Sequence, residues 1–254
     1  MIYDNSIVDA FLHDIPISNQ ALYPYIKGYQ KPDKKRKDIV EELTKQTQQI
    51  VETFPVFNPS IWNAVFANMD EYIDSIHICS VVGSSTLCYS AKINDDLYIF
   101  IDLLCVANHT RIVSQMVYIV NNLISLEVSK HCILKQFPLT SNNYNAILDE
   151  AAFVHGFAHY ISWNTSCENY VFHTQTYEER RIQAFGLLSQ ALQVDTIQMQ
   201  QKILTHIHSQ DLWQQFPVVA GMFYFHDTFM ELGMQGIKQL YQMGPKGFIQ
   251  RIFE

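Results

Sequence analysis

The sequence predicts an α+β fold, in which a small, mostly antiparallel sheet is followed by a predominantly helical C-terminal part. Three observations lead to this prediction. Apolar residues recur at helical spacing in the first third of the 254-residue chain. Short runs rich in β-branched and aromatic residues, separated by turn residues, follow between residues 76 and 103. Helical periodicity then continues from about residue 109 to the C-terminus.

The individual elements are marked by start and stop signals. Residues 33–54 combine an Asp33 cap with apolar positions at helical spacing, and Pro55 ends that helix. Asn58-Pro59 then begins another helix, because proline suits the first helical position. Three short strands are expected at 76–83, 87–92 and 97–103, forming a meander. Later helices are expected at 111–128, 143–162, 177–192, 198–208, 216–232, 235–243 and 245–253.

The chain reads as a single domain, residues 1–254, with two lobes. Residues 1–130 would hold the first helices, the sheet and a long helix, and residues 131–254 would be helical. Neither a repeat nor a linker-like segment separates the lobes.

Composition excludes several classes of function. The net charge of -8 argues against general nucleic-acid binding, which needs clustered basic residues. The basic run at residues 31–37 is interrupted by Asp33 and reads as the solvated start of a helix. No segment reaches the roughly 20 apolar residues that span a bilayer, and the N-terminus lacks the features of a signal peptide. We therefore expect a cytoplasmic protein without a membrane partner. The five cysteines form no CxxC pair and are expected to be free thiols.

Two histidines lie one helical turn apart in the segment His155-Gly156-Phe157-Ala158-His159-Tyr160. This spacing can direct both imidazoles at one zinc ion. Glu179 lies 20 residues beyond His159 and could supply a third ligand from the next helix. The same pair is also typical of a polar stripe on a helix, or of two core histidines with hydrogen-bond partners.

The order of these segments resembles that of zincin-type zinc metallopeptidases of the gluzincin branch. The segment 118–127 has the apolar frame that surrounds a His-Glu-x-x-His motif, but it carries Asn121, Asn122 and Ser125 at the motif positions. The segment 155–160 resembles the third-ligand helix, which reads approximately Glu-Gly-(aromatic or Leu)-Ala-x-Tyr. The resemblance covers about residues 70–254 and consists of several weak matches in the right order.

The resemblance implies a degenerate site. Asn121, Ser125 and His155 would occupy the former ligand positions that line the cleft, and Asn122 the position of the catalytic base. No catalytic residue, bound metal or other cofactor is then expected, because an asparagine side chain cannot act as a general base.

In active members of this group, a peptide pairs with the edge strand of the sheet. The resemblance therefore implies a non-catalytic protein that holds an extended peptide or a protein partner. The candidate strand is 98–103, with Tyr98, Phe100 and Asp102 as the contacting residues.

Two alternatives remain open. The first is a zinc-dependent hydrolase with an altered site, in which His155 and His159 bind the metal with Glu178 or Glu179. Gly156 would then stand where the base belongs. The second is a structural or interaction protein without a working cleft.

Overall fold

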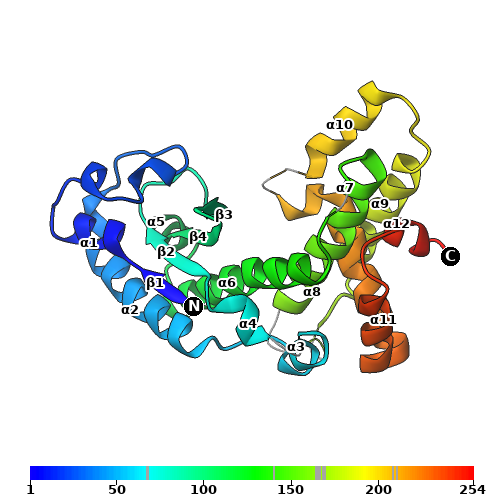
Figure 1. Ribbon diagram of the computed structural model, residues 1–254, viewed down its shortest axis with the longest axis horizontal. Coiled ribbons are helices and arrows are strands. Elements are labelled where there is room, and N and C mark those ends of the chain that lie inside the picture. The colour runs from blue at the N-terminus through cyan, green and yellow to red at the C-terminus, as the bar shows by residue number, and fades with distance from the viewer. Residues whose placement is uncertain (67–68, 140, 164–166, 168–169, 208, 210) are drawn as a thin grey trace. The chain divides into compact units, whose positions relative to one another are not determined.

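The chain is described by a computed structural model, shown in Figure 1. The described residues are 1–66, 69–139, 141–163, 167, 170–207, 209 and 211–254.

The described chain divides into two compact units. Unit 1 comprises Met1–Val56 and Asn68–Val128, and unit 2 comprises Phe57–Ala67 and Ser129–Glu254. Along the chain, the division at Val128 lies close to the boundary between the two lobes expected from the sequence. Residues 57–67, however, belong to the second unit.

Unit 1 contains a four-stranded sheet in the order β1-β2-β4-β3. Strands β1 and β2 pair in parallel, β2 and β4 also pair in parallel, and only β3 is antiparallel to its neighbour. The expectation of a mostly antiparallel meander is therefore wrong. The inner strands are buried along most of their length, as is usual for parallel strands. The strands are β1 (Ile2–Asp4), β2 (His77–Val81), β3 (Cys88–Ile93) and β4 (Asp96–Asp102).

Strand β4 is an inner strand. Its residues pair with β2 on one side and with β3 on the other. The expectation that residues 98–103 form the edge of the sheet is therefore wrong, and a peptide cannot add to this strand. The edges of the sheet, as far as the structure describes it, are β1 and β3.

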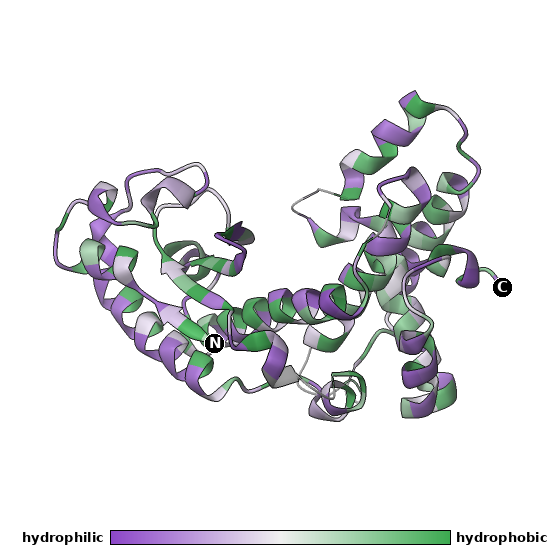
Figure 2. Cartoon of the chain, in the orientation of Figure 1, coloured by the Kyte–Doolittle hydropathy of each residue, from purple (hydrophilic) through white to green (hydrophobic). Residues whose placement is uncertain are grey.

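The amphipathic helix α2 packs against α1, α5 and the first two strands of unit 1. Figure 2 shows hydrophilic and hydrophobic residues interspersed along α2. Its buried residues include Val40, Leu43, Ile50 and Val51, which recur at helical spacing. The helices here are α1 (Ser6–Leu12), α2 (Lys37–Thr53), α4 (Met69–Ile73), α5 (Leu103–His109) and α6 (Val113–Gln136), of which α6 belongs to unit 1 up to Val128.

Unit 2 is helical, as the sequence predicts. Its helices are α3 (Pro59–Val65), α7 (Tyr144–Glu150), α8 (Gly156–Ser162), α9 (Gln175–Ala191), α10 (Ile197–Ile207), α11 (Phe216–Gln242) and α12 (Phe248–Arg251). A π-helical turn, Ala151–His155, joins α7 to α8. Helix α11 is broken at Gly233, whose positive φ of 60° divides it near the expected junction.

Aromatic rings fill the core of unit 2. Phe157 lies 4.6 Å from Phe225 and 5.0 Å from Tyr241, measured between ring centroids. Phe153 and Phe248 extend this cluster at 5.1 Å from each other. Such contacts join the π-helical turn, α8, α11 and α12, and they add stability beyond the burial of apolar area.

All five cysteines are free thiols, as expected from their spacing. Cys79 of β2 and Cys132 of α6 are completely buried. No helix in the described part of the chain is both long and apolar enough to cross a membrane.

Candidate functional site

The former motif positions of α6 lie in unit 1. The Asn121 side chain donates a hydrogen bond from Nδ2 to the carbonyl oxygen of Pro55 at 3.1 Å. Asn122 is partly buried, and Ser125 is fully buried. Asn121 therefore fixes the segment that follows α2, which gives this mid-helix asparagine a structural task.

The two histidines of the His155 segment lie in unit 2, and both are partly buried. Burial holds the pKa of His159 well below its usual value, and the nearby Lys130 and His155 lower that pKa further. His159 is therefore neutral at pH 7. A neutral imidazole suits a metal ligand and a core histidine equally well.

The structure does not bring Glu179 to this histidine pair as a metal site. The Glu179 carboxylate is exposed and accepts a hydrogen bond from Gln175 of the same helix at 2.9 Å. Glu178 lies 3.7 Å from Arg181 and is also engaged along α9. Within the described residues, no three His, Cys, Asp or Glu side chains are arranged to hold a metal ion.

Asn121, Asn122 and Ser125 belong to unit 1, whereas His155 belongs to unit 2. The cleft that would join these former ligand positions therefore remains a prediction.

Tyr98, Phe100 and Asp102, which were expected to contact a peptide, instead make contacts that stabilise the sheet and its connection to α5. Tyr98 stacks on His77 with ring centroids 4.2 Å apart, and Phe100 stacks on Tyr89 at 4.9 Å. The buried carboxylate of Asp102 caps α5 by accepting a hydrogen bond from the Cys105 amide.

Asp102 also accepts a hydrogen bond from the amide of Ser84, so it ties the β2–β3 loop to α5. Burial raises the pKa of this carboxyl. Its oxygens are occupied by backbone amides, which indicates a structural residue.

Strand β3 offers the free edge that was expected of β4. The Asp102 amide donates to the carbonyl oxygen of Leu87 at 3.0 Å, and these residues stand opposite each other in the register. Backbone groups alternate in direction along an antiparallel strand, so those of Tyr89 and Ala91 face β4. The backbone groups of Ser90 and Lys92 consequently point to the outer edge, and both side chains are exposed.

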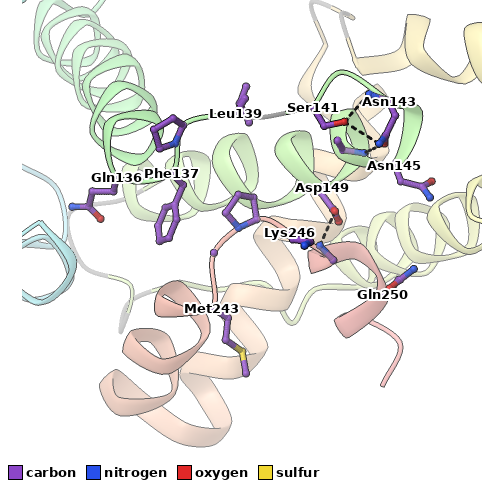
Figure 3. A pocket seen from close by; sticks show the side chains of 15 residues that line it. Gln136, Phe137, Leu139, Ser141, Asn143, Asn145, Asp149, Met243, Lys246 and Gln250 are labelled. Carbon is purple, nitrogen blue, oxygen red and sulfur yellow. Dashed lines mark hydrogen bonds between the residues drawn. The ribbon is translucent and has the colours of Figure 1, made fainter.

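A hollow of about 660 Å³ in unit 2 was not anticipated from the sequence (Figure 3). It lies between the end of α6, the start of α7 and the loop 243–247. Asp149 at its wall accepts hydrogen bonds from the amides of Gly247 and Ile249 at 2.8 and 2.9 Å. Asn143 is likewise occupied, because it caps α7 through Ala146. The sequence predicts a helix over residues 245–253, whereas α12 spans only Phe248–Arg251, so the loop that lines this hollow was missed.

Comparisons with family models, with curated proteins and with solved structures gave no match.

Proposed function

We propose that this chain is a zincin-like protein that binds an extended peptide without cleaving it, and that β3 supplies the binding strand. The observation that carries the proposal is the position of β3: it is the one antiparallel strand among the described strands, and it lies at the edge of the sheet. In the peptidases that the sequence resembles, a peptide pairs with the edge strand.

The chemistry of β3 suits strand addition. The outward backbone groups of Ser90 and Lys92 can form main-chain hydrogen bonds, which supply affinity in this mode of recognition. An exposed lysine at an edge opposes indiscriminate pairing with other strands. A peptide with Asp or Glu opposite Lys92 would gain a cross-strand ion pair. The proposed ligand is therefore an extended peptide with an acidic residue at that position.

Binding without cleavage follows from the residue at the position of the base. The resemblance places Asn122 there, and an amide side chain cannot take a proton from water near neutral pH. The described residues also provide no set of three metal ligands.

The test is a selection of peptides from a random display library, with the whole protein as the bait. For a selected peptide, we expect slower hydrogen exchange at the amides of Ser90 and Lys92. Ser90→Pro removes an outward N–H group, which an edge strand tolerates without loss of its ladder. This variant should bind the peptide at least about tenfold more weakly, a difference of roughly 1.4 kcal/mol.

Ser90→Ala is the matched control, because it changes the side chain and keeps the amide. It should bind the peptide as the unchanged protein does, and both variants should melt at similar temperatures. Failure to select any peptide, or equal binding by the proline variant, would overturn the proposal.

A further inference from the structure

An open hollow of about 700 Å³ lies in unit 1, where the connection between α5 and α6 approaches the start of α2. Its lining consists of Arg36 and Ile39 on one side and residues 107–111 on the other. These residues are more than 65 positions apart in the chain and are brought together by the packing of α2 against α5. The volume falls within the usual range for pockets that bind small molecules.

The lining is basic, although the chain as a whole has a net charge of -8. It includes Arg36, His109 and Arg111, and none of the lining residues is an Asp or a Glu. Arg36 and Arg111 both carry a permanent positive charge, and placing two such charges in one hollow has an electrostatic cost that an anionic ligand would relieve.

The orientation of Arg36 is fixed by a neighbour in the same hollow. Its Nη1 donates to Oδ1 of Asn108 at 2.8 Å, which holds the guanidinium in place and leaves its positive charge uncompensated. Arg111 is exposed, and within the described part of the chain neither arginine forms an ion pair.

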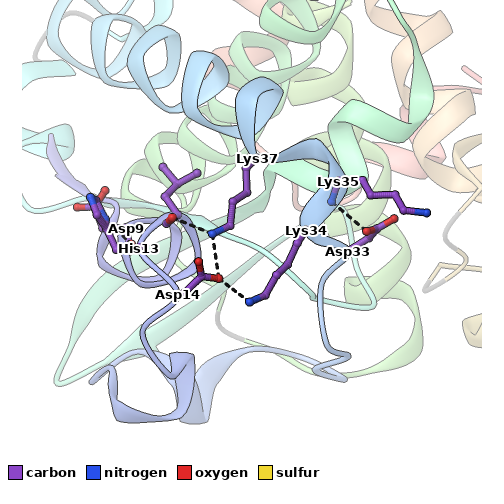
Figure 4. A network of polar contacts seen from close by, with 8 residues as sticks. Asp9, His13, Asp14, Asp33, Lys34, Lys35 and Lys37 are labelled. Carbon is purple, nitrogen blue, oxygen red and sulfur yellow. Dashed lines mark hydrogen bonds and ion pairs between the residues drawn. The ribbon is translucent and has the colours of Figure 1, made fainter.

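Two neighbouring lysines, unlike Arg36, form ion pairs with a carboxylate. Figure 4 shows that Lys34 and Lys37 both reach the carboxylate of Asp14, with Lys37 at 3.0 Å. Lys35 is exposed and does not line the hollow. The basic run therefore contributes one cation, Arg36, to the hollow.

We propose that this hollow binds a small molecule that carries two or more phosphate groups. Guanidinium groups bind phosphate oxygens through paired N–H donors, and two arginines can serve two phosphoryl groups at once. Arg36 provides the oriented donor and Arg111 an exposed one, and Thr110 and Asn108 lie beside them as polar neighbours.

Inorganic pyrophosphate is the probe, titrated into the full chain by calorimetry at constant ionic strength. The unchanged protein should bind it, and Arg36→Gln and Arg111→Gln should each weaken binding by about tenfold or more, as expected for loss of a charge-assisted contact. Lys35→Gln removes the same charge from the adjacent position outside the hollow. This control should change the affinity less than about twofold, because an exposed charge at that site is screened by salt.

Absence of pyrophosphate binding at millimolar concentration would overturn the proposal. Equal weakening in all three variants would also overturn it, since that result indicates attraction to general positive charge. Arg111 is exposed, so Arg111→Gln should retain the melting temperature of the unchanged protein. Weaker binding by this variant can then be attributed to the lost charge and not to unfolding. The β3 edge has no part in this experiment, and the two proposals can fail separately.

Discussion

Gly221 of α11 packs directly against Ala152 in the π-helical turn. A Cβ atom built on Gly221 would lie 1.9 Å from the Ala152 carbonyl oxygen. A Cβ on Gly156 would in turn lie 3.0 Å from the backbone of Gly221. The two helical segments therefore meet backbone to backbone. This close contact gives the π-helical turn that ends at His155 a packing role, whereas such turns frequently mark functional sites.

Replacing Gly221 by alanine should destabilise unit 2, because the added methyl group has no space. We expect a loss of about 1–3 kcal/mol or more in the free energy of unfolding, the usual cost of overpacking. Gly186→Ala is the matched control: apart from the adjacent backbone of α9, no atom of the described residues lies within 4 Å of its Cβ position. Alanine there should stabilise the helix by up to about 1 kcal/mol. Urea denaturation measures both changes, and equal stability of the two variants would contradict the packing argument.

The stability of the protein should fall on mild acidification because of His226. This side chain is 1% exposed, and among the described residues neither ring nitrogen has a hydrogen-bond partner. Burial lowers its pKa; the adjacent Asp227 opposes that shift, while Arg181 and His173 add to it. Asp227 is itself paired with Arg181 of α9.

The sign follows from proton binding. Because the folded pKa lies below the unfolded value of about 6.5, the unfolded chain binds more protons in the interval between them. The contribution of neutral His226 to the free energy of unfolding is complete above pH 6.5. It is lost as pH falls, by up to about 1.4 kcal/mol per pH unit. His226→Phe should flatten this dependence between pH 7.5 and 5.5 in urea titrations, while His159 retains its own contribution. An unchanged slope in the variant would exclude His226 as the source.

Asn121→Ala should cost about 0.5–1.5 kcal/mol of stability, the usual net value of one hydrogen bond. The bond lost is the one to the Pro55 carbonyl. Thermal or urea denaturation of the variant measures this directly. A loss of more than about 3 kcal/mol would instead place Asn121 in a larger buried network.

Zinc content separates the non-cleaving protein from the alternative metalloenzyme. We expect no stoichiometric zinc after equilibration with excess metal and dialysis, and no change on His155→Ala. Elemental analysis of untagged protein provides the measurement. About one zinc ion per chain that is lost in the variant, or peptide hydrolysis that a chelator abolishes, would refute the proposal of binding without cleavage.

The sequence was informative about helices and poor at strand order. Helical periodicity located α2, α9 and both parts of α11, because one apolar face recurs through each of them. The order of strands in a sheet produces no periodic pattern in the sequence. The segment 97–103 carries apolar side chains on both faces, which is typical of a strand covered on both sides, whereas the resemblance implied an edge strand there. Strand β1 has only three residues and gave no usable signal.

The candidate sites depended on contacts between distant residues. Asn121 meets Pro55 across 66 positions, and Arg36 meets Asn108 across 72. Periodicity and motif spacing describe only neighbours along the chain, so neither contact could be derived from them. The same applies to Gly221 and Ala152, whose proximity follows from the packing of α11 on the π-helical turn.

Two of the buried thiols, Cys79 and Cys132, can report on the opening of one unit each. Burial raises the pKa of Cys79 above its usual range and that of Cys132 to about 12, so neither forms the thiolate that alkylating reagents attack. In the native protein they should react only when their surroundings open. The rate of alkylation at Cys79 therefore measures the opening of unit 1, and the rate at Cys132 measures the opening of unit 2. Mass spectrometry of the alkylated protein can therefore follow the opening of each unit at a native cysteine, without introducing a new one.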